Sequence, residues 1–292
     1  MKHNQLGIAL GGGGILGVAH IGVLEVLEEN GITPAVVTGT SAGSIVGALY
    51  AAGVNLSVLR ELSLNLHKED IFAWNFNPYS FVQFLLHNLR DIANLLDAIP
   101  RALFSGKKIG QLVERITNKN CFSEIARPFG VVAVDLITGN KVVFSNIPSQ
   151  PQLPGTVFFR EAPLGAAVQA SCAIPGVFEP VPYRGTLLAD GGLMEMVPAP
   201  LARLLGSRKV IGVSLKQKGS VQEPQSLMQV VQRGINIMNL QGTRLDLESA
   251  DLIIEPLALE AKLDDFGWVP ELLERGRQAA LEALLDLKKL LI

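Results

Sequence analysis

Short apolar runs alternate with glycine-rich turns and amphipathic stretches in the N-terminal part of the chain. Leu6–Leu10 is an apolar run of strand length, and residues 15–29 carry apolar positions near helical spacing. A second apolar run at residues 36–38 and a second helical pattern at residues 44–52 repeat this order, and a glycine closely follows each helical pattern. The order strand, helix, strand, helix predicts a parallel sheet that is covered by helices.

Further apolar runs of strand length follow, and we expect them to extend the same sheet. They lie at residues 130–134, 142–145, 186–189, 210–215 and 252–254. Long helical patterns at residues 227–250 and 269–291 surround the last run, after a polar, linker-like stretch at residues 216–225. We interpret these C-terminal patterns as parts of the same α/β domain.

Residues 65–105 differ from the rest because large apolar side chains lie there among scattered charges. These side chains are Phe72, Trp74, Phe76, Phe81, Phe84, Leu85, Leu89, Leu95, Leu96 and Phe104. One interpretation is a helical insertion that caps an active site and touches a bilayer. The other is ordinary packing of helices onto the sheet, which we favour.

The charge of the chain is nearly balanced, with 25 Lys and Arg against 27 Asp and Glu and a formal net charge of −2. This balance gives no electrostatic footprint for nucleic acid, so we expect no nucleic-acid partner. Hydrophobic residues make up 48% and charged residues 18% of the chain, which excludes a disordered protein and is compatible with contact with lipid.

Two uncharged stretches, residues 3–24 and 30–59, are long enough to span a bilayer. Both are interrupted by glycines, four of them consecutive in the first stretch, so they fit buried strands, turns and helices better. The same glycines stand where a secretory signal needs an unbroken apolar core. Cys121 and Cys172 fit neither a disulfide framework nor a zinc site. We therefore expect a cytoplasmic protein in a reducing compartment.

The first chemical motif is Gly39-Thr40-Ser41-Ala42-Gly43, between the second expected strand and the second expected helix. Small residues on both sides of the serine allow the tight turn that exposes a nucleophile and directs a helix N-terminus toward it. Chance alone can produce Gly-x-Ser-x-Gly in a chain with 29 glycines. Its place between a strand and a helix favours a nucleophile.

The second motif, a glycine run at residues 11–14 followed by Ile15, Leu16 and Gly17, also joins a strand to a helix. Successive backbone N–H groups can point into one concavity there, which suits a phosphate or a tetrahedral oxyanion. The run also fits the dinucleotide pattern G-x-G-x-x-G, but that site needs an acidic residue at the end of the second strand, where Thr38-Gly39-Thr40 stands. A Walker loop is excluded because no Gly-Lys-Ser/Thr follows.

A serine nucleophile needs a base, and the histidines limit the choice. All four (His3, His20, His67 and His87) lie in the first third of the chain, so a triad in the order Ser, Asp, His is impossible. We expect His20 to be buried and structural, and His67 and His87 to lie on solvated or packing faces. Asp190-Gly191-Gly192 remains as the candidate, directly after an expected strand, where open α/β sheets place functional groups, although alone it also fits a β-turn.

Together and in this order, the glycine loop, the Gly-x-Ser-x-Gly turn and the Asp-Gly-Gly segment resemble the patatin-like phospholipase family. Residues 17–24, 132–139 and 170–178 also look like connecting segments of that family. The resemblance covers about residues 6–205 and implies a three-layer α/β/α fold with a mostly parallel central sheet and a helical insertion at about residues 65–105. Residues 206–292 would then complete the same domain.

The resemblance also implies an activity: a serine acyl hydrolase that cleaves carboxyl esters of lipids, as a phospholipase or lysophospholipase does, through an acyl-enzyme. Ser41 would be the nucleophile and Asp190 its partner in a Ser–Asp dyad, with oxyanion donors from Gly12, Gly13 and Gly14. Structural roles within the motifs would fall to Gly17, Gly39, Gly43, Gly191 and Gly192. No metal and no organic cofactor is required, and the expected partners are a lipid or ester substrate and the surface of a membrane.

Two positions depart from the family pattern. Leu16 stands where the family usually has Arg or Lys, and the segment before Pro198 lacks the asparagine that related sequences often carry. Two alternatives to the hydrolase therefore stay open. The first is a lipid-binding or regulatory protein with little turnover, and the second is a dinucleotide-binding oxidoreductase.

Overall fold

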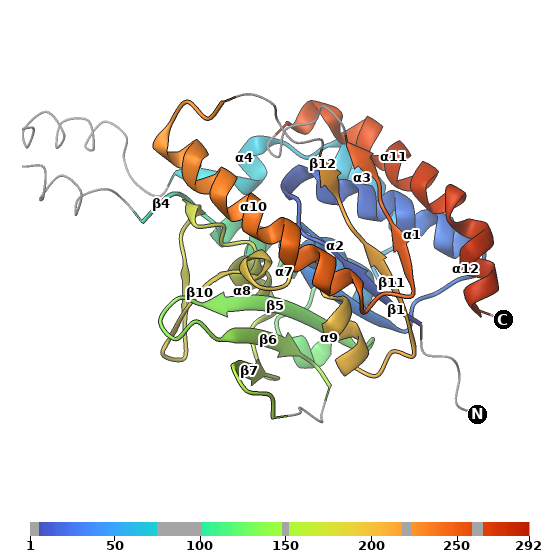
Figure 1. Cartoon of the computed structure of the whole chain (residues 1–292), viewed down its shortest axis with the longest axis horizontal. Helices are drawn as coiled ribbons and strands as arrows, with labels where there is room; N and C mark the ends of the chain where they lie inside the picture. Colours follow the sequence, from blue (N-terminus) through green and yellow to red (C-terminus); the bar gives the residue numbers. More distant parts are fainter. Residues whose placement is uncertain (1–5, 75–100, 148–151, 218–222, 259–264, 292) are drawn as a thin grey trace, which may run out of the picture.

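The computed structural model describes residues 6–74, 101–147, 152–217, 223–258 and 265–291 (Figure 1). In this part of the chain nine strands form the main sheet, in the order β13-β11-β1-β2-β5-β10-β9, with β6 beside β5 and β7 beside β6. The strands are β1 (Leu6–Leu10), β2 (Val36–Thr40), β5 (Phe129–Asp135), β6 (Lys141–Ser145), β7 (Thr156–Phe159), β9 (Val181–Tyr183), β10 (Thr186–Asp190), β11 (Lys209–Val213) and β13 (Leu252–Ile254).

The directions of the strands divide the sheet into two parts. The strands β13, β11, β1, β2 and β5 all run parallel, and Ile8 of β1 lies in register between Val37 of β2 and Ile211 of β11. Beyond β5 the pairs β5/β6, β5/β10 and β10/β9 are antiparallel. The carboxyl ends of β1 and β2 therefore meet at one edge, where α/β sheets place their functional groups.

Helices cover both faces of the sheet. The described helices are α1 (Ala19–Glu29), α2 (Ala42–Ala51), α3 (Leu56–Leu64), α4 (Lys68–Ile71), α7 (Lys107–Thr117), α8 (Leu164–Ser171), α9 (Ala199–Leu204), α10 (Leu227–Leu247), α11 (Val269–Glu282) and α12 (Leu284–Leu291). Ile8 and Leu10 are buried in the large core together with residues of α1, α2, α8 and α11, whereas Ala9 between them belongs to a smaller core with α9. This alternation along β1 confirms the predicted three-layer α/β/α fold with a mostly parallel sheet.

The pair α1 and α11 packs at unusually short range, and glycines make this possible. A Cβ atom on Gly22 of α1 would lie 2.1 Å from the carbonyl oxygen of Leu273, and one on Gly276 of α11 would lie 1.9 Å from that of Ala19. Figure 1 shows the two helices side by side, in red and blue. Helix α11 thus packs directly against α1, although the two lie near opposite ends of the described chain.

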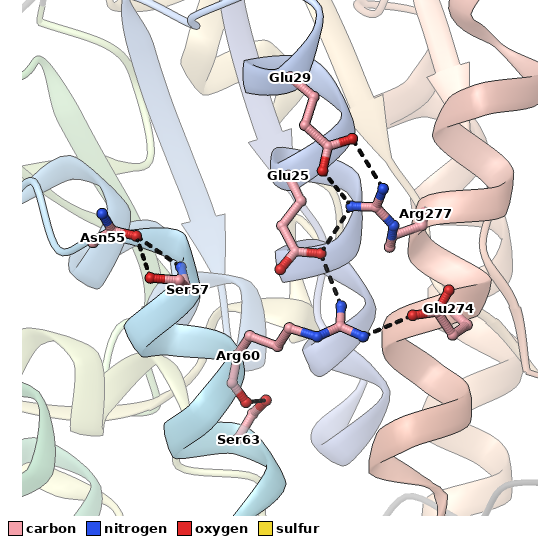
Figure 2. A network of polar contacts seen from close by, with 8 residues as sticks. All are labelled: Glu25, Glu29, Asn55, Ser57, Arg60, Ser63, Glu274 and Arg277. Atoms are coloured by element: carbon pink, nitrogen blue, oxygen red, sulfur yellow. Dashed lines mark hydrogen bonds and ion pairs between the residues drawn. The ribbon is translucent and has the colours of Figure 1, made fainter.

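Ion pairs join the same two helices to α3 (Figure 2). Glu25 of α1 accepts hydrogen bonds from Arg60 of α3 at 3.0 Å and from Arg277 of α11 at 3.1 Å. Arg277 also binds both carboxylate oxygens of Glu29, and Arg60 reaches Glu274 at 2.7 Å. The Glu25 side chain is only 11% exposed, so removing either arginine would leave a nearly buried carboxylate with one partner fewer.

The sequence expectations for the sheet are confirmed, with shifts at the ends of elements. The helical pattern at residues 15–29 is a 3-10 turn, η1 (Gly14–Val18), followed by α1, and the pattern at residues 269–291 is divided into α11 and α12. The sheet is mostly parallel, as predicted, and its exceptions are that β6 and β10 run antiparallel to β5 and β9 runs antiparallel to β10. Short connections join β5 to β6 and β9 to β10, and such antiparallel pairs need no crossover helix.

Most of the region at residues 65–105 lies outside the described residues, as does His87. Its described ends contain α4, β3 (Ala73–Trp74) and β4 (Ala102–Ser105), and β4 pairs with β8 (Gly176–Phe178). Phe72 stacks on Phe178 with ring centroids 5.3 Å apart and meets Phe104 edge-on at 4.9 Å. These ends are thus packed on the body of the protein.

Candidate active site

Ser41 occupies the sharp turn between β2 and α2 in a backbone conformation that few residues other than glycine adopt, with φ 51° and ψ −124°. The glycines on either side leave no room for a side chain. A Cβ atom on Gly39 would lie 2.3 Å from the carbonyl oxygen of Gly43, and one on Gly43 would lie 2.0 Å from that of Leu10. The turn therefore presses α2 against the end of β1 and holds Ser41 at the first turn of α2.

The end of α8 supports both Ser41 and Asp190. The backbone N–H of Ser41 donates to Oγ of Ser171 at 2.9 Å, and the backbone N–H of Asp190 donates to the carbonyl oxygen of Ala173 at 3.0 Å. These two acceptors are two positions apart in sequence. They bring the end of β10 to the turn that follows β2.

Asp190 is the last residue of β10 and is almost completely buried. Burial raises the pKa of its carboxyl group to about 6, and the Ser41 hydroxyl and the Gly192 N–H counteract part of this rise. Oδ1 accepts a hydrogen bond from Gly192 N at 2.7 Å. Oδ2 is buried without a hydrogen-bond partner among the described residues, and the Ser41 hydroxyl lies near enough to the carboxyl group to lower its pKa.

The glycine loop lies beside Ser41, since a Cβ atom on Gly12 would be 3.2 Å from Cβ of Ser41. The N–H of Gly12 donates to the carbonyl oxygen of Met196 at 3.0 Å, which occupies one of the three expected oxyanion donors. Gly13 directly precedes η1, and Gly14 is its first residue. Neither N–H group has a hydrogen-bond acceptor among the described residues. An anion in this loop would therefore meet the N–H groups of Gly13 and Gly14.

His20 has the buried, structural role that we expected for it, because it binds the start of the glycine loop. Its ring is fully buried, and Nε2 lies 2.8 Å from the carbonyl oxygen of Gly11. Burial lowers its pKa to about 4, so the ring is neutral at physiological pH and Nε2 carries the proton that it donates to Gly11. His67 lies at the surface, as expected, with its side chain 75% exposed.

The side chain of Met196 fills the space between the two glycine motifs. Its Sδ would lie 2.7 Å from a Cβ atom on Gly12, and its Cε would lie 2.8 Å from one on Gly192. A flexible thioether thus lies between the glycine loop and the segment that follows Asp190. Cys172, whose pKa is raised by burial and by the charge of Asp190, adds a second apolar sulfur nearby.

Glu195 ties together the loops that carry the two motifs. Its carbonyl oxygen accepts the hydroxyl of Thr40, the residue before Ser41, at 2.8 Å. Its carboxylate accepts Lys141 Nζ at 2.8 Å and the N–H of Leu201 at 3.1 Å, and it is buried. The Asp190 loop is therefore anchored to β2, β6 and α9 at once.

Sequence reasoning placed Ser41, Asp190 and the glycines but missed Ser171, Met196 and Glu195. Ser171 belongs to the family-like segment at residues 170–178, which gave no indication that a serine there would accept the nucleophile's N–H. The contact joins residues that are 130 positions apart. Spacing along the chain carries no signal for a contact of this kind.

Two other features are weaker candidates for a functional site. An open groove of about 610 Å³ runs between α1, α3 and α11, but its lining includes the ion-paired Glu25, Arg60 and Arg277 and none of the predicted site residues. No cluster of His, Cys, Asp and Glu that could hold a metal ion occurs in the described part of the chain.

Both cysteines are free thiols. None of the described helices has the length and apolar character to cross a bilayer.

Comparison with known proteins adds sequence and fold relatives. A family model described as patatin-like phospholipase matches residues 8–203. An uncharacterized NTE family protein of Mycobacterium bovis is 32% identical over 223 residues, which are 75% of this chain and 51% of that protein. The chain thus spans about half the length of this relative.

More distant matches extend this picture. Human patatin-like phospholipase domain-containing protein 6 is 28% identical over 214 residues, covering 73% of this chain and 13% of that protein. Among solved structures, VipD from Legionella pneumophila matches 98% of this chain and 67% of its own chain, with a TM-score of 0.51 and 16% sequence identity. The last match is a likeness of fold.

Proposed function

The chain belongs to the patatin-like phospholipase family, and from this premise we propose that it is a serine hydrolase that cleaves carboxyl esters of lipids. The observation that carries the proposal is the burial of Asp190 beside the hydroxyl of Ser41, which raises the pKa of the aspartate to about 6. An aspartate of ordinary pKa is a weak base, and this shift brings it nearer to the pH at which a general base works.

In the proposed first step, Asp190 takes the hydroxyl proton of Ser41 while Oγ attacks the ester carbonyl carbon. The oxyanion that forms is stabilised by the N–H groups of Gly13 and Gly14 and by the N-terminus of α2. The protonated Asp190 then gives its proton to the departing alcohol as the carbon–oxygen bond breaks, which leaves an acyl-enzyme on Ser41. In the second step Asp190 takes a proton from water as the water oxygen attacks the acyl carbonyl carbon. Asp190 then returns the proton to Oγ of Ser41 as the ester bond to the enzyme breaks and the fatty acid leaves.

We propose Gly13 and Gly14 as the oxyanion donors and leave out Gly12, because the N–H of Gly12 already donates to the carbonyl oxygen of Met196. Leu16, which replaces the basic residue usual in the family, is buried with 1% exposure and offers no charge to the substrate. We therefore propose that main-chain dipoles stabilise the negative charge of the oxyanion, with no contribution from a cationic side chain at position 16.

The test combines covalent labelling with turnover. We expect a fluorophosphonate probe to label Ser41 in the wild type, and we expect Ser41→Ala to abolish both labelling and ester hydrolysis. Asp190→Asn should lower kcat by about 10²–10⁴-fold, the usual contribution of a general base. The matched controls are Ser123→Ala and Asp286→Asn, which change the same residue types at exposed positions.

Substrate profiling separates the remaining interpretations. Hydrolysis of lysophospholipids or phospholipids supports a lipid hydrolase, whereas turnover of short-chain nitrophenyl esters alone would reduce the assignment to a simple esterase. Lipid binding without labelling or turnover would contradict the proposal and leave a lipid-binding protein.

A further inference from the structure

Helix α10 presents its apolar side to the outside of the protein. Among the described positions that are partly or fully buried, the polar residues outnumber the apolar ones. The polar ones are Gln232, Arg233, Asn239, Thr243 and Asp246, and the apolar ones are Ile235 and Leu247. The exposed side carries Val230, Val231, Ile237, Met238, Leu240 and Leu245, with exposures of 52%, 48%, 58%, 75%, 66% and 65%. A surface helix of a globular protein normally has the opposite arrangement.

Five of these six side chains fall on one stripe, because helical neighbours recur at three, four and seven positions. Val231, Met238 and Leu245 follow one another at intervals of seven, and Val230 and Ile237 lie beside them. We call these five residues the outer face of α10. A contiguous exposed apolar patch of this kind marks an interaction surface rather than ordinary scatter.

The charges of α10 restrict what the outer face can bind. Residues 226–245 contain Arg233 and Arg244 and neither Asp nor Glu, in a chain whose net charge is −2. Arg244 is exposed at the side of the stripe. Apolar residues flanked by arginine are typical of helices that lie in the surface of an anionic bilayer. A second copy of the chain would bring Arg244 against the same outer face, which carries no acidic residue to pair with it.

The position of α10 connects this face to the candidate active site. The carboxylate of Asp246, near the end of α10, accepts the backbone N–H of Val197 at 3.1 Å, in the segment that follows Asp190. The helix also contacts α9 and η3 (Gly191–Leu193), which begins directly after Asp190. Met194, at the end of η3, is 47% exposed. Figure 1 shows α10, in orange, running along the outside of the molecule.

From these observations we propose that the outer face of α10 is the surface by which the protein lies on an anionic lipid layer. The proposal rests on the proposed function, because it assigns the place where a lipid hydrolase meets its substrate. The apolar side chains enter the boundary between head groups and acyl chains, and Arg244 contacts lipid phosphates. The Asp190 loop, which α10 touches, is then held next to the lipid layer.

Vesicle flotation tests this surface with a matched control. The variant Met238→Glu/Leu245→Glu places two charges at positions that are 75% and 65% exposed, and the control Leu285→Glu/Ile137→Glu places them at apolar positions that are 75% and 66% exposed elsewhere. Both are made in the full-length protein carrying Ser41→Ala, so that the lipid stays intact. The vesicles contain phosphatidylcholine alone or equal parts of phosphatidylcholine and phosphatidylglycerol.

We expect the Ser41→Ala protein and the control to bind the phosphatidylglycerol vesicles more strongly than phosphatidylcholine alone, and the α10 variant to lose at least about tenfold in partitioning. Equal binding by the α10 variant and the control, or no vesicle binding by the parent protein, would overturn the proposal. So would light scattering that shows a dimer dissociated by the α10 substitutions, because the face would then join two copies.

A second measurement keeps this inference separate from the proposed function. With Ser41 restored, hydrolysis of a water-soluble short-chain ester should be unchanged by the α10 substitutions, while hydrolysis of vesicle lipid falls in parallel with binding. Absence of ester hydrolysis in the wild type would contradict the proposed function and leave the vesicle-binding result standing by itself.

Discussion

Burial of Asp190 determines how the proposed reaction depends on pH. The pKa of this carboxyl group is raised to about 6, and only its ionised form can accept the proton of Ser41. We expect kcat/KM for a water-soluble ester to be constant above neutral pH and to fall about tenfold for each pH unit below 6. A pH–rate profile of the wild type measures this directly, and a rate that stays constant down to pH 4 would exclude Asp190 as the base.

The same burial predicts that the aspartate makes the fold less stable at neutral pH. Its folded-state pKa of about 6 lies above the ordinary value of 3.8, so ionising the group costs the folded protein about 3 kcal/mol relative to the unfolded chain. This cost is absent below pH 3.8, grows as the pH rises through this range and is complete above pH 6.

Asp190→Asn removes that cost and retains an acceptor for the N–H of Gly192. We expect the variant to have a strongly reduced kcat yet a higher free energy of unfolding at pH 8, by up to about 3 kcal/mol, with the gain shrinking toward pH 4. Urea unfolding at pH 8 and pH 5 measures the difference, with Asp286→Asn as the exposed control. A less stable Asp190→Asn protein at pH 8 would show that the carboxylate is stabilised by contacts we have not identified.

At this scale the sequence predicted residues that belong to motifs and missed those defined by position in space. Ser41, Asp190 and the glycines stand in recognisable local patterns, and the structural role of His20 followed from its place after the glycine loop. Ser171 and Met196 reach the site through contacts with distant segments, and Gly12 has its N–H occupied by one of them. A local sequence pattern does not predict which side chain or carbonyl group from a distant segment will contact the site.

Among the elements, the contact between α1 and α11 is the most sensitive to added volume. Gly276→Ala would place a Cβ atom 1.9 Å from the carbonyl oxygen of Ala19, so the helices must separate. We expect a loss of about 1–3 kcal/mol in unfolding free energy, the usual cost of overpacking. The control is Gly234→Ala on the exposed side of α10, where no atom lies within 4 Å and alanine should stabilise by about 0.5–1 kcal/mol.

Thermal unfolding of the two alanine variants should therefore shift the melting temperature in opposite directions. An unchanged melting temperature of the Gly276→Ala variant would mean that α11 can move away from α1 without a loss of stability. The ion pairs of Arg277 and Arg60 with Glu25 would then have to tolerate the same displacement (Figure 2).

Periodicity predicted the elements better than their directions or their orientation. The apolar runs and helical spacings located β1, β2, α1 and α2 because local residues determine them. Strand direction depends on the length and path of connections, so the antiparallel β6, β9 and β10 were not predicted. For α10 the helical pattern was right, but amphipathicity alone does not say whether the apolar side faces the protein or a lipid.

The whole molecule depends on strands supplied from both ends of the chain. β1 lies between β2 and β11, and β11 begins at Lys209, after the family-matched region 8–203 has ended. We therefore predict that residues 206–292 are required for folding. A chain cut after Gly206 would expose the edge of β1 and the Gly22 side of α1, and we expect it to be insoluble or unfolded by circular dichroism.

The full chain should, on the same reasoning, lose its described sheet in one cooperative step. Differential scanning calorimetry that resolves two separate transitions, or a soluble, folded fragment ending at Gly206, would show two domains in place of one. The sequence predicted the single domain from the order of its elements. It could not predict that β11 pairs with β1, because parallel neighbours in a sheet need not be neighbours along the chain.

The position of β11 also affects synthesis of the protein on the ribosome. β1 leaves the ribosome well before its partner on one side, which is translated some 200 residues later, at Lys209–Val213. Throughout that interval the nascent chain carries an apolar strand with one unpaired edge, the kind of surface that associates with other chains. We therefore expect newly made copies to depend on a chaperone, or on separation from one another, until β11 is made and pairs with β1.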